Sequence, residues 1–577
     1  MEKFYKIIKN IKVDKLLNIK NYLLLGNFVL VVALIVLENL NILPFRNIGD
    51  FGFFVALIFI VALYRPGWTF LFFAGTIMLE NINLAPAEFG LILRPYQLIG
   101  LLTFLAVMVR YFTGRLGFGL PKISGVDILV LVFVMAGFFS SIFSLNKGIA
   151  FKQSLIIFSF AIIYYLTRIF VQRLSDIKKI LPFFLESSLL VSAYGIWQNW
   201  IFMKGGNHFE IMPGRPNATF FEPDWLGMFI VLVISVVYAM IFYLMHLSKS
   251  RSEILTLDFW KVFYKRIFVY DDEFKKVFFH KILAVLFVVL ILTVSRSAWV
   301  GVVAITILYI GLVFYFFGLM NKEWRKVREI FIYWLATMTI SFLVIYVFGL
   351  TNFELGKRLQ STGGKQEITI SCSQKRVLPK EIKNISELTE YKCRHINLEE
   401  IESEKKRGNF VAKIYRNDPN VNIRAEIYKK SWKQIIQHPI LGIGWGGISQ
   451  VLGKDENGNG LNSSNIFLEV WLGGGVIAFL SLTMIFILIF SESMVGLFRI
   501  NEINFRKLFH WRGSGNFDEI MVNDKKPGKL DTGIAKSWNL FMLLSGVAVL
   551  IPNLFNAGIM LGFLWVWLGV VSLKNNN

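Results

Sequence analysis

Two arginines stand at the ends of hydrophobic segments, where a charged side chain is costly and therefore informative. Arg215 lies in the stretch 214–227, which leads directly into a hydrophobic segment, and Arg296 lies in the stretch 293–301, at the junction of two such segments. A guanidinium is permanently charged and can donate two parallel hydrogen bonds, so two arginines that face one cavity would bind a phosphate or a pyrophosphate. The alternative is that each arginine only extends its long side chain to the membrane interface.

Carboxylates near these arginines are candidates for a general base. Glu222 and Asp224 follow Arg215 at the mouth of the hydrophobic segment. Glu469 follows Asn465 by about one helical turn, and the amide of Asn465 would orient a sugar or a phosphate. A carboxylate in an apolar cavity has a raised pKa, and a neighbouring arginine lowers that pKa again. We therefore expect Glu222 and Glu469 to be the catalytic carboxylates.

Two further polar segments come later in the chain. The first holds Arg424 and, after Trp432, the sequence His-Pro-Ile-Leu-Gly-Ile-Gly over residues 438–444. His438 begins a turn there and is a further candidate for the base. The second is Asn-Ser-Ser-Asn-Ile-Phe-Leu-Glu, residues 462–469, which opens another hydrophobic segment.

Taken together and in this order, the four segments resemble the O-antigen ligase and O-antigen polymerase superfamily. These proteins are multi-span glycosyltransferases that act on polyprenyl-pyrophosphate-linked glycans. The resemblance is concentrated in residues 210–480. It rests on an arginine entering a helix, a Ser-Arg at a helix junction, an arginine before His-Pro-x-x-Gly-x-Gly, and a polar helix opening.

The resemblance implies a role for each matching residue. Arg215 and Arg296 match the arginines that bind the lipid pyrophosphate, and Arg424 matches the arginine that precedes the His-Pro-x-x-Gly-x-Gly stretch. The ligases open the next segment with His-Asn, whereas this chain has Ser464-Asn465. A serine hydroxyl has no pKa suited to removing a proton at neutral pH, so a polymerase is favoured over a ligase. The residues expected to contact the substrate are Arg424, Asn465, Ser464, Asp224 and His438.

The predicted reaction is direct displacement at an anomeric carbon. A hydroxyl of a glycan, lipid or polymer acceptor attacks, and polyprenyl pyrophosphate leaves while the arginines stabilise its charge. Because arginines supply this charge, we expect neither a metal ion nor another cofactor. The early loops agree, since they carry no Asp-x-Asp pair.

Composition places the chain in a membrane. Apolar residues make up 55% of it and charged residues 17%, whereas soluble proteins have about 25% charged residues. The apolar residues fall in blocks of about 17 to 25, the length that crosses about 30 Å of hydrocarbon. We therefore predict an all-α polytopic membrane protein with about fourteen transmembrane helices. The predicted spans are 23–40, 50–64, 67–80, 95–113, 127–144, 153–171, 180–203, 225–247, 281–295, 298–319, 330–350, 466–490, 537–554 and 557–573.

The placement of basic residues predicts the orientation. The net charge is +22, and lysines and arginines gather near the N-terminus and in alternate loops, among them 249–281 and 499–536. By the positive-inside rule both termini lie in the cytoplasm of a plasma (inner) membrane protein, and the long loop 351–465 lies outside. The charge thus reports topology and attraction to anionic membrane lipids, and we expect no nucleic-acid partner.

The loop 351–465 is predicted to be an α-rich extracytoplasmic domain. Residues 367–371 are typical of a short strand, and residues 379–407 predict charged helix or coil. A helix that ends before Pro439 would lie on the membrane surface or cap a cavity below it. Its apolar stripe consists of Ile423, Ile427, Trp432, Ile435 and Ile436.

The only two cysteines of the chain, Cys372 and Cys393, both lie in this loop. Two thiols in an oxidising compartment predict one disulfide. The alternative is two unpaired thiols. A zinc site would need more ligands than these cysteines and His395 supply.

The chain is thus predicted to have three parts: residues 1–350 with eleven transmembrane helices, the loop domain 351–465, and residues 466–577 with three helices and a basic cytoplasmic loop at 497–536. A transporter or flippase of a lipid-linked glycan is the main alternative function, because arginines facing a lipid-phosphate cavity would suit it too. The chain has no paired halves of the inverted-repeat kind, and a long external domain fits an enzyme that works outside the cell.

Overall fold

The computed structural model describes residues 19–573 except 91, 145, 207–213, 248–271, 351–364, 375–378, 380, 383–386, 389, 397–400, 418, 454–459 and 499–528. The predicted basic loops at 249–281 and 497–536 therefore lie largely outside the described residues.

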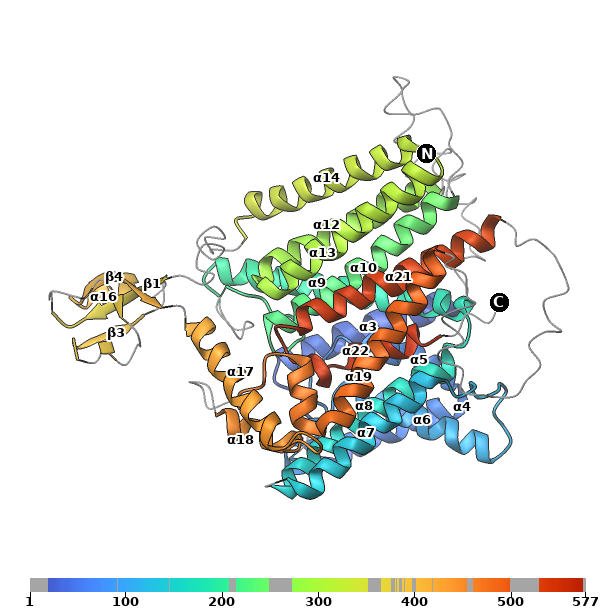
Figure 1. Ribbon diagram of the computed structural model, residues 1–577, viewed down its shortest axis with the longest axis horizontal. Helices are drawn as coiled ribbons and strands as arrows, with labels where there is room; N and C mark the ends of the chain where they lie inside the picture. The colour runs from blue at the N-terminus through green and yellow to red at the C-terminus, as the bar shows by residue number, and fades with distance from the viewer. Residues whose placement is uncertain are drawn as a thin grey trace.

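Helices dominate the described residues and lie side by side in one bundle (Figure 1). Eleven of them are long and apolar enough to cross a membrane. They are α3 (Ile19–Asn39), α6 (Pro95–Phe112), α7 (Gly125–Phe143), α8 (Lys147–Phe170), α9 (Leu174–Met203), α10 (Pro223–Leu247), α12 (Asp272–Thr293), α13 (Arg296–Val313), α14 (Trp324–Val347), α19 (Ile466–Phe498) and α21 (Lys529–Asn553). Shorter helices are α4 (Ile48–Tyr64), α5 (Pro66–Thr76) and α22 (Gly562–Val571). Each of the fourteen predicted spans coincides with one of these helices, so the polytopic fold class is confirmed, while the number of spans stays a prediction.

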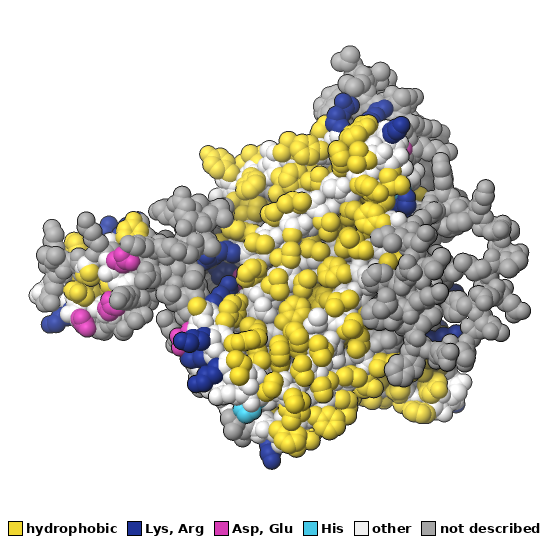
Figure 2. All heavy atoms as spheres, viewed as in Figure 1, with side chains coloured by type: hydrophobic (Ala, Val, Ile, Leu, Met, Phe, Trp, Pro, Cys, Tyr) yellow, Lys and Arg dark blue, Asp and Glu magenta, His cyan; other side chains and the backbone are white. Residues whose placement is uncertain are grey.

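The bundle is built around α10. This helix packs against α12, α13 and α21, and its residues from Leu226 to Tyr238 are nearly all buried. A helix that is apolar on every side is stable only when other apolar surfaces surround it. Helices at the outside instead expose large apolar side chains, among them Tyr346 and Phe112, which are 85% and 81% exposed. Figure 2 shows that hydrophobic side chains cover this face of the bundle, as a surface in contact with lipid requires.

The long loop contains a four-stranded sheet, which Figure 1 shows beyond one end of the helix bundle. The strands are β1 (Lys365–Cys372), β2 (Glu381–Ile382), β3 (Cys393–His395) and β4 (Phe410–Asn417), in the order β2-β4-β1-β3. β1 pairs antiparallel with β3 and β4, and β2 pairs parallel with β4. The strand predicted at 367–371 is present within β1. The prediction of helix or coil for 379–407 missed the two short strands β2 and β3, which both come before the helix α16 (Ile401–Lys406).

A disulfide and a buried carboxylate hold this sheet together. Cys372 faces Cys393 across β1 and β3, and the two are joined by a disulfide. The side chain of Glu404, on α16, is only 3% exposed. It accepts hydrogen bonds from Ser371 Oγ at 2.6 Å and Asn409 Nδ2 at 2.8 Å and pairs with Arg394 at 3.0 Å. These bonds lower the pKa of Glu404 from 4.5 to about 2.

The helix predicted before Pro439 is α17 (Pro419–Gln437), followed by the short helix α18 (Ile448–Leu452). Ile427 and Ile435 are buried against the bundle, whereas Trp432 and Ile436 are 53% and 64% exposed. The predicted apolar stripe is therefore split between two faces. The inner face contacts α19, and on the outer face Trp432 and Ile436 lie among exposed charged residues such as Lys429 and Lys433.

Candidate functional site

The segment that carries Arg215 is a turn held from two sides. The N–H of Ala218 donates to Gln198 Oε1, near the end of α9, at 2.7 Å. Thr219 Oγ1 donates to the carbonyl of Met78, just after α5, at 2.6 Å. Ala218 and Thr219 are both buried. Polar groups buried in an apolar bundle need such partners, so the turn leading into α10 has a defined conformation.

Arg215 joins this turn to the α12–α13 junction. Its Nε donates to the backbone carbonyl of Thr293 at 2.9 Å, and its Nη2 contacts Asp224 Oδ1 at 3.1 Å. The side chain of Arg215 is 12% exposed. Thr293 ends α12, and Asp224 lies in the first turn of α10. One guanidinium thus spans two of the predicted site segments.

Arg296 is the first residue of α13 and lies three residues after Thr293. Its side chain is partly buried. Between the two stands Val294 with a φ of 51°, a left-handed conformation that is an outlier for a β-branched residue. Ser297 Oγ accepts a hydrogen bond from Asn556 Nδ2 at 2.9 Å. The junction is therefore tight, strained and tied to the segment before α22.

Asn465 caps the N-terminus of α19. Its Oδ1 accepts from the N–H groups of Phe467 and Leu468 at 2.9 and 3.2 Å, which are first-turn donors without partners inside the helix. Its Nδ2 donates to the carbonyl of Leu554 at 3.0 Å. The amide predicted to orient the substrate therefore has a structural role in this conformation.

The three predicted segments are connected through these bonds. Arg215 bonds to the residue that ends α12, Asn556 bonds to the residue after Arg296, and Leu554 bonds to Asn465. Leu554 and Asn556 belong to the same short connection between α21 and α22. The helix N-termini of α10, α13 and α19 are thereby brought to one end of the bundle, and helix N-termini favour anions.

Ser464 is the residue that the sequence resemblance places at the ligase histidine position. It has a φ of 51°, and its N–H donates to Asn462 Oδ1 at 2.9 Å. Its carbonyl accepts from the hydroxyl of Tyr428, on α17, at 3.4 Å. Ser464 thus sits in a strained turn that links the loop helix to the start of α19.

The three candidate carboxylates differ in their surroundings. Asp224 pairs with Arg215. Glu469 Oε2 accepts from the N–H of Ser463 at 2.7 Å, which closes the turn before α19. The backbone carbonyl of Glu222 accepts the first hydrogen bonds of α10, and its side chain is partly buried. All three lie in the segments that the network joins.

The His-Pro-x-x-Gly-x-Gly stretch is a turn that fits into a break in α19. The carbonyl of Pro439 accepts from Trp471 Nε1 at 2.9 Å, and the N–H of Ile443 donates to the carbonyl of Leu472 at 2.7 Å. Gly475 interrupts α19 with a φ of 69°. A side chain there would collide with the carbonyl of Ile440. The glycines of this stretch therefore serve packing.

Arg424 and His438 differ from the residues above in being exposed. Arg424 lies near the start of α17, and His438 directly follows its last residue. In the described part of the chain no side-chain hydrogen bond holds Arg424. Among the described residues, no side-chain hydrogen bond or ion pair joins Arg424 or His438 to the Arg215–Asn465 network, and their predicted roles stay predictions.

A buried ion pair beside the site was not recognised from the sequence. Glu80 is fully buried, pairs with Arg94 Nε at 3.0 Å and accepts from the hydroxyl of Tyr96 at 2.9 Å. It also accepts from the N–H of Gly562, the first residue of α22, at 2.7 Å. The guanidinium of Arg94 lies 5.5 Å from the ring centre of Phe221, next to Glu222. The one signal for it was Glu80 itself, a carboxylate at the end of a hydrophobic segment.

Across the described ranges, no group of three or more His, Cys, Asp and Glu side chains is arranged to hold a metal ion. Residues 282–483 match the family model described as O-antigen ligase. Among the curated proteins and the solved structures, none matches the chain. The matched range contains Arg296, Arg424 and residues 462–469, and Arg215 lies before it.

Proposed function

Through residues 282–483 the chain belongs to the O-antigen ligase and polymerase superfamily, and from this premise we propose that it polymerises a polyprenyl-pyrophosphate-linked oligosaccharide at the outer leaflet. The family is one of membrane glycosyltransferases with lipid-linked glycans as substrates. Our proposal adds the polymerase activity, the pyrophosphate-binding arginines, the independence from metal ions and an orientation with both termini in the cytoplasm.

The observation that carries the proposal is the bond between Arg215 and the carbonyl of Thr293. It brings an arginine from outside the matched domain to within three residues of Arg296, inside it. Two guanidiniums at one end of the bundle, beside the N-termini of α10 and α13, suit a pyrophosphate better than a single interfacial arginine would.

The proposed step is a displacement at the anomeric carbon of the donor. An acceptor hydroxyl oxygen forms the new glycosidic bond, and the bond between that carbon and the pyrophosphate oxygen breaks. The electron pair leaves with polyprenyl pyrophosphate, where Arg215 and Arg296 stabilise the added negative charge. The hydroxyl proton goes to a carboxylate, for which Glu222 is our first candidate and Glu469 the second.

The assignment of residues to the acceptor is supported by fewer contacts. Arg424 and His438 lie on the loop helix, and Ser464 is joined to that helix through Tyr428. We propose that these residues contact the acceptor glycan, with Asp224 and Asn465 positioning the arginine side of the site. The serine at the ligase histidine position favours a polymerase.

The test is reconstitution of the purified chain in vesicles with a polyprenyl-pyrophosphate oligosaccharide, with glycan length followed by electrophoresis. We expect chain growth that persists with a chelator. Arg215→Ala and Arg296→Ala should each lower the rate at least about 100-fold, the usual effect of losing a charge-stabilising donor. Arg325→Ala, an exposed arginine at the start of α14, is the matched control. Movement of the glycan across the membrane without a new glycosidic bond would instead show a transporter.

A further inference from the structure

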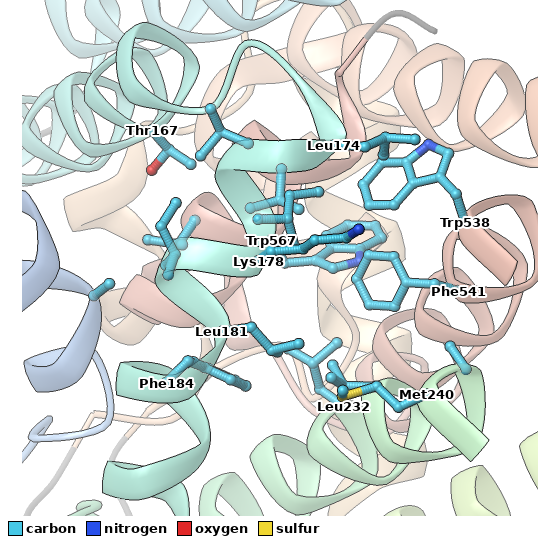
Figure 3. Close-up of a pocket in the computed structure, with 18 of the residues that line it drawn as sticks. Thr167, Leu174, Lys178, Leu181, Phe184, Leu232, Met240, Trp538, Phe541 and Trp567 are labelled. Carbon is cyan, nitrogen blue, oxygen red and sulfur yellow. The ribbon is translucent and has the colours of Figure 1, made fainter. Parts of the chain in front are cut away.

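An apolar cavity of about 260 Å³ lies inside the bundle, away from the arginines. It is lined by α8, α9, α10, α21, α22 and part of α5, and Figure 3 shows Phe184, Leu232, Met240, Phe541 and Trp567 among its lining side chains. Among the described residues that line it, Lys178 alone carries a charge. Because the lining is almost wholly apolar, it offers water few hydrogen-bond partners and suits a hydrocarbon chain.

The cavity lies along the second half of α10, whereas the proposed catalytic site lies at the start of this helix. Asp224, which pairs with Arg215, is in the first turn of α10, whereas the cavity is lined by α10 residues from Leu232 to Tyr243. At about 1.5 Å per residue these positions lie roughly 12 to 28 Å further along the helix. Lys178 is near the start of α9, so the charged edge of the cavity is at the end of the bundle remote from the arginines.

Lys178 and its neighbour Lys179 differ in their contacts. Lys179 Nζ pairs with Asp176 at 3.1 Å. Lys178 is exposed, lines the cavity, and makes no ion pair within the described residues. A lysine at the edge of an otherwise apolar cavity matches a ligand with an anionic head and a hydrocarbon chain.

We propose that the cavity holds an acyl chain of an anionic phospholipid, whose phosphate is bound by Lys178. The apolar lining contacts the chain, and the ammonium group of Lys178 lies at headgroup level, as lysines near helix ends do. The surrounding membrane supplies this ligand, and the cavity is too small for more than part of one chain. The bound lipid fills the space that α9 shares with α10, α21 and α22. This site is separate from the proposed catalytic site and does not depend on it.

The test uses the full-length protein in detergent, titrated with phosphatidylglycerol or with phosphatidylcholine of the same acyl chains, and bound lipid is counted by native mass spectrometry. Lys178→Ala should weaken phosphatidylglycerol binding about five-fold, the effect of one basic residue on an anionic lipid. Phosphatidylcholine binding should not change. Lys179→Ala makes the same change of charge one residue away and should alter neither lipid by more than about two-fold.

A second variant tests whether the cavity holds the acyl chain of the lipid. Ala239→Phe places a ring in the cavity from α10 and should remove the binding of both lipids; if it does not fold, Val236→Phe serves the same purpose from the same helix. Equal losses in Lys178→Ala and Lys179→Ala would overturn the proposal, as would full lipid binding by a filled variant. Displacement of phosphatidylglycerol by an equal concentration of polyprenyl phosphate would assign the cavity to the isoprenoid tail of the donor instead.

Discussion

Arg215 Nε donates to the carbonyl oxygen of Thr293 at 2.9 Å. The two residues are 78 positions apart, and the bond ties the turn before α10 to the end of α12. Because the same guanidinium contacts Asp224 at 3.1 Å, Arg215 has both a structural contact and a charged face. Any role in binding a pyrophosphate requires that the charged face exchange Asp224 for the ligand, or bind the ligand beside it.

The geometry of Arg215 predicts that lysine cannot replace it. A lysine keeps the charge but lacks the planar fork that reaches Thr293 and Asp224 together. We expect Arg215→Lys to lose at least about 10-fold in polymerisation rate, less than Arg215→Ala, with an unchanged amount of folded protein. Single-turnover rates with a lipid-linked oligosaccharide measure this. A fully active lysine variant would show that only the charge matters.

Two variants of Asn465 can distinguish a structural role of this residue from a functional one. Asn465→Ala removes the cap of α19 and should lower the free energy of unfolding by about 1 kcal/mol. Asn465→Asp keeps an oxygen that accepts from Phe467 and Leu468 but loses the donor to Leu554. Thermal unfolding in detergent should therefore rank the wild type above the aspartate variant, with the alanine variant lowest.

The activities of the same Asn465 variants decide between the two roles. If activity follows stability through the series, Asn465 only holds the site together. If both variants are inactive at temperatures where they remain folded, the amide contacts the substrate as the sequence predicts.

The membrane fold could be predicted from the sequence because each span is a continuous run of apolar residues, which is visible in the sequence itself. Each hydrophobic block must be a helix, since a lipid-facing backbone has no other way to satisfy its polar groups. The sheet at 365–417 was mostly missed. Its strands β2 and β3 have two and three residues, too short for an alternating pattern, and they are held by pairing with β1 and β4 and by the disulfide.

Only part of the candidate site could be predicted from the sequence. Arg215 and Arg296 could be chosen because charges at membrane boundaries are rare. That Arg215 bonds to the residue ending α12 depends on tertiary packing, which one sequence does not reveal. The Glu80–Arg94 pair was missed because each residue resembles an ordinary loop charge, and only the fold buries Glu80 completely.

Gly475 should tolerate no side chain. Its φ of 69° disfavours other residues, and a Cβ there would collide with the backbone carbonyl of Ile440. We expect Gly475→Ala to displace the turn at 439–443 and to destabilise the protein by more than about 1 kcal/mol. Gly311→Ala is the matched control, because a Cβ at this helical glycine meets nothing within 4 Å. The yield of monodisperse protein after heating measures the difference, and equal yields would contradict it.

Glu404 makes the sheet sensitive to acid. Because hydrogen bonds from Ser371 and Asn409 and the pairing with Arg394 hold its pKa at about 2 instead of 4.5, the stabilisation is fully present above pH 4.5. It is lost as the pH falls toward 2, where the folded state must also take up the proton. Glu404→Gln lacks this contribution at every pH.

Hydrogen exchange of the β1 and β3 amides, compared between wild type and variant at each pH, should show several-fold better protection in the wild type at pH 6. That advantage should shrink as the pH falls below 4. Exposed Glu390, changed to Gln, is the control and should match the wild type throughout. A wild-type advantage that persisted unchanged to pH 2 would mean that the Glu404 carboxylate does not stabilise the sheet through its charge.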